Sequence, residues 1–311
     1  MAKKGNNHHL SIHTFRDATK DFLARVKVKD SSFSTYSFIC ERHLLPFFRD
    51  IELDNIDDEI INQFIKFKLE NGGLKGTPIS PKTINDMVNL LMQIVRSYSE
   101  FDLDIEKLSS RQKEISVFTE KEYYKLKNYL STETDSAKLG IITTMLTGIR
   151  LGELCALKWD RIDLANGFIH IDKTMQRIKI ASKTEKTKII IDTPKSEASI
   201  RTIPISTVLL DNLKQFESHS NSYLLTSTPK FIEPRSYQRY FKSCLVTSGV
   251  NDNKFHTLRH TFATMAIARG MDIKTLSVLL GHTDVSFTMK RYVHPNMEHK
   301  RVQIEKLAAG F

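Results

Sequence analysis

Three short segments of this 311-residue chain combine residue types that can bind and attack a phosphate group. In the first, Arg150 and Glu153 stand three residues apart behind Gly148, whose backbone freedom allows a tight turn into a new helix. Residues three apart share one face of a helix, so the two side chains can pair. An isolated pair of this kind is usually an ordinary surface ion pair, so its meaning depends on the other two segments.

In the second segment, His256 and Arg259 are also three residues apart. On a helix they would share a polar face, whereas Leu258 would lie on a different, buried face. A guanidinium presents a planar fork of donors and an imidazole adds another, a combination that suits a phosphate. Taken alone, such a pair is more often a solvated helix face.

The third segment ends in a tyrosine. Gly281 is a natural residue for the end of a helix, so His282 leaves that helix at a defined place. Tyr292 follows ten positions after His282, directly behind Lys290 and Arg291. A phenol has a pKa near about 10, so a tyrosine nucleophile needs a cationic environment or a base at neutral pH.

Together and in this order, the segments resemble those of the tyrosine recombinase, or phage integrase, family. That family has an arginine box, a His-x-x-Arg box, a Leu-Gly-His segment and a tyrosine, which match Arg150, His256 to Arg259, Leu280 to His282, and Tyr292. The resemblance covers residues 115–311. It extends more weakly over residues 10–105, which look like the family's helical core-DNA-binding domain.

The resemblance implies a role for each of these residues. Tyr292 would attack the scissile phosphate and form a 3′-phosphotyrosine link. Arg150 and Arg259 would bind the non-bridging oxygens, while His256 and His282 would hydrogen-bond the phosphate and assist proton movement. Guanidinium and imidazole donors can stabilise the charge that develops on the phosphate without a metal.

Two further roles follow from the same resemblance. Glu153 looks like the acidic residue that supports the arginine pocket. The family's general acid, a lysine on a β-hairpin that protonates the leaving 5′ oxygen, is best matched by Lys195. Lys183, Lys186 and Lys188 are close enough in sequence to keep that assignment open.

No cofactor is expected. The covalent phosphotyrosine would store the energy of the broken phosphodiester, so rejoining would need no ATP, and the sequence has no GxxxxGK[ST] loop. The three cysteines are widely separated, which argues against a disulfide framework and a zinc site.

The expected fold is mostly α-helical with a small antiparallel β-sheet. Residues 10–105 are predicted to form a helical bundle, the SAM-like core-binding domain, and residues 106–117 a linker. Residues 118–311 would form the α+β catalytic domain. Ser80-Pro81 and Thr119 with Glu122 are helix-start signals. The predicted strands are the β-branched runs 168–171, 188–192 and 200–205.

The charge distribution indicates a polyanionic partner. The chain carries 46 Lys+Arg and 36 Asp+Glu, a net charge of +10. Residues 1–108 hold 15 basic and 16 acidic side chains, whereas residues 109–311 hold 31 and 20, so the surplus lies in the C-terminal part. With the resemblance, this predicts a homo-tetramer on two synapsed DNA duplexes that carry a specific recombination site. Whether a directionality factor also takes part stays open.

The predicted helix from Pro81 to Tyr98 is a candidate to enter the major groove, through Lys82, Asn85 and Asn89. No signal peptide is recognisable, and the most apolar stretch, residues 139–149, is too short to span a bilayer. We therefore expect a cytoplasmic protein without a membrane partner.

Alternative classes remain open at this point. A helix-turn-helix regulator without catalysis would fit residues 261–293, which read as helices separated by turns at Gly270 and Gly281. It would leave Arg150 unexplained and would not require Tyr292 to be a tyrosine.

A metal-dependent nuclease would need clustered carboxylates, for which Asp160 and Asp163 are available without an obvious third. A type IB topoisomerase would share the tyrosine chemistry but would relax supercoils without requiring a site.

Overall fold

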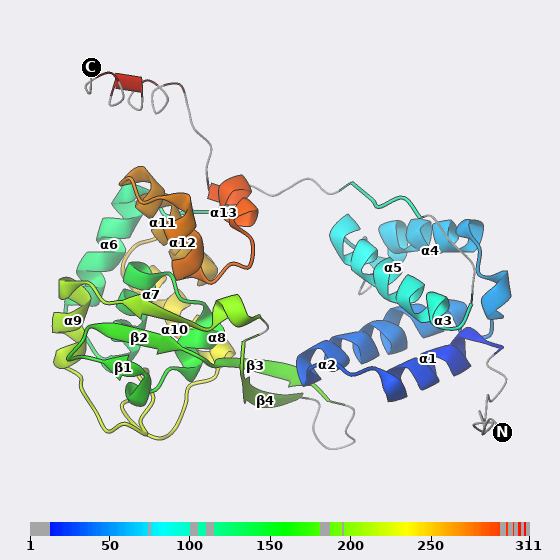
Figure 1. Cartoon of the computed structure of the whole chain (residues 1–311), viewed down its shortest axis with the longest axis horizontal. Helices are drawn as coiled ribbons and strands as arrows, with labels where there is room; N and C mark the ends of the chain where they lie inside the picture. Colours follow the sequence, from blue (N-terminus) through cyan, green and yellow to red (C-terminus); the bar gives the residue numbers. More distant parts are fainter. Residues whose placement is uncertain are drawn as a thin grey trace, which may run out of the picture. The chain divides into compact units, whose positions relative to one another are not determined.

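The computed structural model describes residues 13–73, 76–99, 105–109, 115–180, 187–194 and 196–292, with the single positions 297, 301, 304, 305 and 308. The chain divides into two compact units (Figure 1). One unit contains Met1–Lys113 with Ile178–Lys188, and the other contains Glu114–Arg177 with Ile189–Phe311.

The first unit is helical. Its helices are α1 (Phe15–Arg25), α2 (Asp30–Ile39), α3 (Leu45–Phe48), α4 (Asp58–Asn71) and α5 (Pro81–Arg96). A π-helical turn, η1 (Cys40–Leu44), joins α2 to α3, and a 3-10 turn, η2 (Leu53–Asn55), precedes α4. Phe15, Phe48 and Phe64 are fully buried, and the ring of Phe48 contacts the other two.

The start of α5 confirms the prediction from Ser80-Pro81. The Ser80 side chain accepts a hydrogen bond from the Thr83 N–H, and Pro81 occupies the first helical turn, where its missing N–H costs nothing. The helix ends at Arg96, two residues before the predicted Tyr98, whose hydroxyl donates to Asp21 of α1 at 2.7 Å.

The second unit contains the remaining helices of the described residues. They are α6 (Glu120–Ser131), α7 (Ser136–Thr147), α8 (Leu151–Ala156), α9 (Thr207–Lys214), α10 (Pro234–Thr247), α11 (His256–Ala268), α12 (Ile273–Leu280) and α13 (Val285–Tyr292). The 3-10 turns η4 (Trp159–Arg161) and η5 (Glu197–Ser199) complete it. The capping box predicted at Thr119 and Glu122 is present at the start of α6.

Two small sheets replace the single predicted sheet. Strands β1 (Ile162–Asp163), β2 (Phe168–Ile171) and β5 (Arg201–Pro204) form an antiparallel sheet in the order β1-β2-β5. The predicted strand at 188–192 is instead part of β4 (Thr187–Asp192), which pairs with β3 (Thr174–Lys179).

All three predicted runs contain strands, but these belong to two sheets, because β4 pairs with β3, and β3 gives no strand signal. Its apolar residues, Met175 and Ile178, are three positions apart, which is a helical and not a strand spacing. The broader expectation, a mostly helical chain with little β-structure, is confirmed.

Helix α7 ends where the sequence predicts a turn. Gly148 has φ +67°, in the left-handed region that favours glycine, and a Cβ there would lie 2.5 Å from Cδ1 of Phe262. The end of α7 therefore packs directly against α11. No helix among the described residues is long and apolar enough to cross a membrane.

Candidate active site

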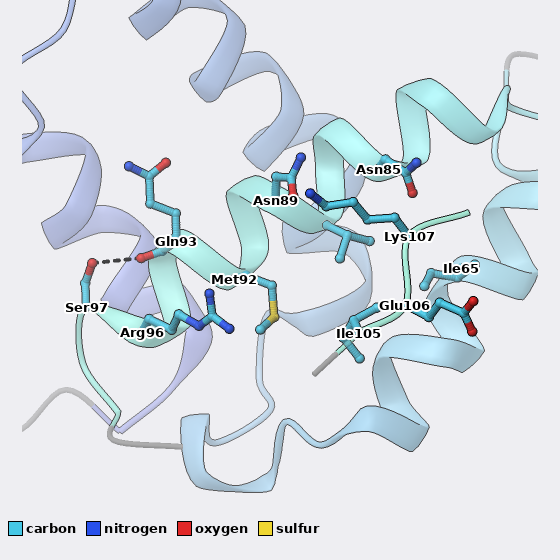
Figure 2. Close-up of a pocket in the computed structure, with 11 residues that line it drawn as sticks. Ile65, Asn85, Asn89, Met92, Gln93, Arg96, Ser97, Ile105, Glu106 and Lys107 are labelled. Carbon is cyan, nitrogen blue, oxygen red and sulfur yellow. Dashed lines mark hydrogen bonds between the residues drawn. The ribbon is translucent and has the colours of Figure 1, made fainter. Parts of the chain in front are cut away.

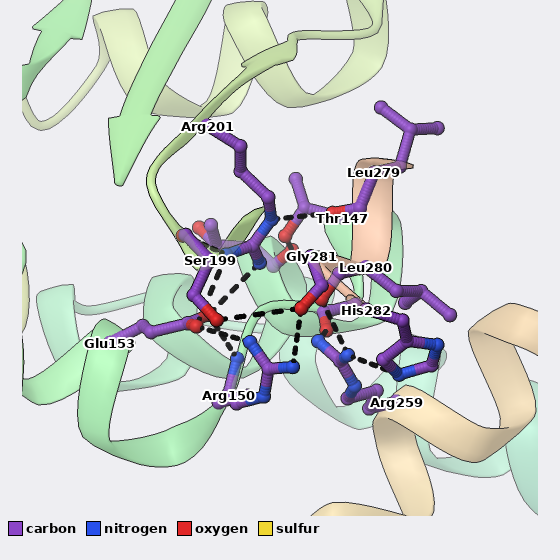
Figure 3. Close-up of polar contacts among 12 residues, drawn as sticks. Thr147, Arg150, Glu153, Ser199, Arg201, Arg259, Leu279, Leu280, Gly281 and His282 are labelled. Atoms are coloured by element: carbon purple, nitrogen blue, oxygen red, sulfur yellow. Dashed lines mark hydrogen bonds and ion pairs between the residues drawn. The ribbon is translucent and has the colours of Figure 1, made fainter. Parts of the chain in front are cut away.

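A buried carboxylate, Glu153, is the centre of the polar network in the second unit (Figure 3). Only 2% of its surface is exposed. Its oxygens accept from Arg150 Nη1 at 2.7 Å and the Arg150 backbone N–H at 2.9 Å, and from Arg201 Nη1 and Nη2 at 3.1 and 2.9 Å. Burial alone would raise the pKa of Glu153, but the hydrogen bonds and charge of Arg201 outweigh it and lower the pKa.

Arg150 lies at the start of α8, as the sequence predicts, with its backbone N–H held by Glu153. Its Nη2 donates to the carbonyl oxygen of Gly281 at 2.9 Å, which ties α8 to the end of α12. About a third of its side chain, 34%, is exposed. It borders a cleft of about 580 Å³ that His282 and Phe287 also line.

The sequence analysis missed Arg201. This arginine begins β5 and is buried, with its Nε donating to the Leu279 carbonyl at 2.6 Å and its Nη1 to the Ser199 carbonyl at 3.0 Å. The sequence signal for Arg201 was weak, because an arginine at the edge of a β-branched run is normally interpreted as an exposed strand residue. Only the fold shows that it shares the carboxylate of Glu153.

Gly281 allows this close packing. It has φ +64°, and a Cβ would lie 3.0 Å from the Ala198 carbonyl oxygen and 3.1 Å from Arg201 Cδ. The predicted helix end at Gly281 is thus confirmed. Close contact with Ala198 and Arg201 is a second reason, besides the turn, for a glycine at this position.

Arg259 is buried and not on the solvated face that helical spacing suggests. It is 1% exposed. Its Nη1 donates to the Gly148 carbonyl at 2.8 Å, and its Nη2 to the Leu280 carbonyl at 2.6 Å. The guanidinium therefore links the turn before α8 to the end of α12, and its position is fixed before any ligand binds.

His282 is held on both sides of its ring. Arg259 Nη2 lies 2.9 Å from its Nε2, and Thr288 Oγ1 lies 2.7 Å from its Nδ1. An arginine only donates, so Nε2 is the acceptor and Nδ1 carries the proton toward Thr288. Desolvation, and then the charges of Arg259 and Arg150, lower the pKa of His282 to about 3.

His256 begins α11, and its side chain reaches solvent. Desolvation by its surroundings, and then the charges of Arg259 and Arg291, lower its pKa to about 4. His256 therefore lies beside the same arginines as His282, although the two come from different helical segments.

Tyr292 ends α13 and is 7% exposed. Its hydroxyl lies 2.7 Å from Nδ1 of His260, a residue on which the sequence analysis placed no role. Burial raises the pKa of Tyr292, and the charges of Arg259 and Arg291 oppose that effect. The sequence did carry a signal for His260. It follows Arg259 directly, and it stands four positions after His256, so that it shares a side of the helix with His256.

Lys195 lies outside the described residues, as do Lys183 and Lys186. Its chain neighbours Pro194 and Ser196 both line the cleft beside Arg150. Lys188 pairs with Asp30 within the first unit at 3.0 Å.

The predicted DNA-reading residues lie on α5 (Figure 2). The Asn85 side chain accepts from the Leu108 N–H at 3.0 Å and donates to the Leu108 carbonyl at 2.9 Å. Asn89 lines a pocket of about 520 Å³ between α5 and residues 105–107, and Lys82 is exposed at the start of the helix. In this conformation, Asn85 holds part of the predicted linker.

The carboxylates considered for a metal site have other partners. Asp160 lies 3.7 Å from Arg161, and Asp163 accepts from the backbone and side chain of Asn166. Among the residues that the structure describes, no three His, Cys, Asp or Glu side chains gather as metal ligands would.

Comparison with protein families matches residues 116–299 to the phage integrase family. Residues 14–69 match the phage integrase N-terminal SAM-like domain. The chain belongs to the phage integrase family, the tyrosine recombinases, which confirms the resemblance seen in its sequence.

Several curated proteins are similar to the chain. A "Tyrosine recombinase XerC-like" protein of Caldanaerobacter subterraneus subsp. tengcongensis is 30% identical over 213 residues, 62% of this chain and 54% of that protein. The chain thus spans about half the length of this relative. The "ICEBs1 integrase" of Bacillus subtilis is 22% identical over 92% of this chain and 80% of its own length.

Solved structures share the fold. The Tn1549 transposon integrase, in complex with transposon right end DNA, has a TM-score of 0.76 at 19% identity, covering 95% of this chain and 99% of that one. A lambda integrase tetramer bound to a Holliday junction has a TM-score of 0.60 at 20% identity, covering 90% and 78%.

Proposed function

We propose that this chain is a site-specific DNA recombinase, an integrase that cleaves and rejoins DNA strands through a 3′-phosphotyrosine at Tyr292. The observation that carries the proposal is the gathering of the three sequence segments around one buried carboxylate. Arg150 is held by Glu153 and the Gly281 carbonyl, and Arg259 by the Gly148 and Leu280 carbonyls, so the two guanidiniums have defined positions, which supports a pre-organised phosphate site.

In the proposed cleavage step, the Tyr292 oxygen attacks phosphorus, and the 5′ oxygen leaves with a proton supplied by Lys195. Arg150 and Arg259 stabilise the charge on the non-bridging oxygens, and His256 adds a donor. His282 would join the donor set once its Nε2 is protonated and released from Arg259. Rejoining reverses these events, with Tyr292 as the leaving group. Removal of one such donor typically costs about 10²–10³ in rate.

We further propose that the first unit is the core-DNA-binding domain and the second the catalytic domain. The substrate would be double-stranded DNA with a specific site, and a homo-tetramer would act on two synapsed duplexes. A lambda integrase tetramer on a Holliday junction, with the same fold, supports this assembly by analogy. If a directionality factor also takes part, adding it to the reaction should change the ratio of integration to excision.

Covalent trapping tests the proposal. Wild-type protein and Tyr292→Phe would be incubated, in EDTA, with labelled nicked duplexes tiled from the DNA that flanks the gene. A nick near the scissile phosphate releases a short fragment and traps the intermediate. We expect a denaturation-resistant labelled protein band with the wild type only.

Two other results would redirect the assignment. Tight binding to one duplex without any adduct would favour a helix-turn-helix regulator. An adduct on every duplex, with relaxation of any supercoiled plasmid, would favour a type IB topoisomerase.

A further inference from the structure

The hydroxyl of Tyr292 has a defined partner in the catalytic unit. His260, on the second turn of α11, places Nδ1 2.7 Å from the Tyr292 oxygen, and both residues are 7% exposed. The two rings are tilted at 52° with centroids 5.7 Å apart, so the contact is made through the hydrogen bond and not by stacking. A buried pair of this kind fixes the position of the phenol oxygen.

Arg291 determines which way this hydrogen bond runs. Its Nη2 lies 3.4 Å from the other ring nitrogen of His260, Nε2. Because a guanidinium has only donors, Nε2 must accept, and a neutral imidazole then carries its single proton on Nδ1. His260 therefore donates to the Tyr292 oxygen.

His260 is neutral in this environment. Desolvation, followed by the charges of His256 and Arg291, lowers its pKa to about 3. The ring of His256 stands edge-on to it with centroids 4.5 Å apart. A second proton on His260 would sit on Nε2 and face the Arg291 guanidinium, so the ring offers one N–H and one lone pair over the ordinary pH range.

We propose that His260, oriented by Arg291, is a catalytic hydrogen-bond donor to the reacting oxygen of Tyr292, and is not its base. This inference rests on the proposed function of Tyr292 as the nucleophile. The donor stabilises negative charge on the phenol oxygen, both when it is deprotonated for cleavage and when it leaves during rejoining.

The atoms balance without a base at His260. In cleavage, the Tyr292 oxygen forms its bond to phosphorus while its proton passes to water. The 5′ oxygen breaks from phosphorus and takes a proton from the general acid. In rejoining, the Tyr292–phosphorus bond breaks and the phenolate forms against the Nδ1–H of His260.

The charged groups that face the Tyr292 oxygen come from three elements. Arg259, His256 and His260 belong to α11, Arg291 to α13, and Arg150 to the start of α8. Arg259 and Arg150 act on the phenolate through charge, Arg291 adds both charge and a side-chain hydrogen bond, and His260 adds a further directed hydrogen bond at 2.7 Å. Loss of that bond would leave the arginines in place and raise the pH at which the phenolate forms.

The test compares His260→Asn with His260→Leu in the full-length protein. An asparagine amide keeps an N–H donor near the position of Nδ1 but takes up no proton near neutral pH. Leucine keeps the volume and loses the donor. The exposed His219→Asn is the matched control. The readout is the single-turnover rate of adduct formation on a nicked duplex as a function of pH, with duplex affinity and thermal unfolding measured in parallel.

We expect His260→Leu to slow adduct formation by about 10²-fold at neutral pH, with its rate still rising at pH values where the wild-type rate has levelled. His260→Asn should stay within about 10-fold of the wild type. DNA affinity should be unchanged in both variants.

Three outcomes would overturn the inference. If His260→Asn were as slow as His260→Leu while folded and bound to DNA, His260 would act as a base. If both matched the wild type, the contact would be packing alone. A faster rate in His260→Leu would mean that His260 restrains the nucleophile. Absence of any adduct with the wild type would instead defeat the proposed function itself.

A measurement on the unmutated protein covers the case in which the variants do not fold. Long-range ¹⁵N–¹H correlation spectra of histidine-labelled protein report which ring nitrogen carries the proton. The spectrum of His260, assigned by its absence in His260→Asn or by the shift caused by Tyr292→Phe, should show Nδ1–H. An Nε2–H tautomer would contradict the inference.

Discussion

Replacing Glu153 with glutamine should destabilise the second unit and remove most of the proposed activity. The carboxylate is 2% exposed and accepts hydrogen bonds from two arginines. A glutamine keeps one acceptor oxygen, but its amide NH₂ must face one donor of Arg150 and one of Arg201, because each carboxylate oxygen accepts from both arginines. The two guanidiniums then share a buried site without a counter-charge.

The expected loss in the free energy of unfolding follows from the hydrogen bonds that are lost. Of the four hydrogen bonds to Glu153, glutamine can keep the two that one oxygen receives. Two charge-assisted bonds at about 1.5–3 kcal/mol each agree with the roughly 3–5 kcal/mol typical of a broken buried ion pair. For a unit of this size, that corresponds to a fall in Tm of about 6–20 °C.

The pH dependence gives an independent check. The folded-state pKa of Glu153 is depressed, so its contribution to stability is present above the ordinary carboxyl range and is lost as pH falls through the folded pKa. Glu153→Gln should therefore lose stability mainly near neutral pH and approach the wild type in acid.

Differential scanning calorimetry across pH, with the exposed Glu217→Gln as control, measures both effects. A loss below about 1 kcal/mol at neutral pH, the size of a surface pair, would refute the view that Glu153 anchors the arginines. A loss that did not depend on pH would refute the assigned charge state.

Three further predictions concern other residues of the proposed site. Gly281→Ala should lower both Tm and the adduct rate, because its Cβ would press on the Ala198 carbonyl and on Arg201 at a left-handed φ; wild-type values in calorimetry and trapping would contradict this. Thr288→Val should slow adduct formation by about 10-fold with DNA affinity unchanged, because His282 loses the acceptor for its Nδ1–H; a gel-shift and trapping series measures both. Lys195→Ala should slow cleavage of ordinary DNA by about 10²–10³-fold but spare a substrate with a 5′ bridging sulfur, because a thiolate leaves without a proton; equal loss on both substrates would remove Lys195 from the role of general acid.

Local signals in the sequence proved reliable because their physics is local. The caps at Ser80 and Thr119 and the left-handed ends at Gly148 and Gly281 depend on a few consecutive residues. Each places a helix end where the sequence predicts it, and the positions of Arg150 and His282 follow from those ends. The spacing of the motifs was therefore enough to predict the elements that carry the site.

Contacts between distant segments were not predictable in the same way. Arg201 is 48 residues from Glu153, and His260 is 32 residues from Tyr292. Arg201 has no local pattern that distinguishes it from a surface residue, and the position of His260 beside Arg259 does not reveal that it contacts Tyr292. Helical spacing likewise predicted a solvated Arg259, whereas the packing of α11 against α7 and α12 buries it.

The helix-turn-helix alternative was reasonable because it rested on local helix and turn signals. Helices α11, α12 and α13 do follow one another with short turns at Gly270 and Gly281. A regulator, however, has no use for Arg259 fixed by carbonyl oxygens beside a tyrosine hydroxyl held by a histidine. The family match over residues 116–299 supports the recombinase.

Identification of the covalently modified residue tests the central claim most directly. The trapped protein–DNA adduct would be digested with nuclease and protease, and its peptides sequenced by tandem mass spectrometry. We predict a nucleotide linked through its 3′ phosphate to Tyr292, with a free 5′ hydroxyl on the released strand. A nucleotide on any other residue, or a link through a 5′ phosphate, would contradict the account.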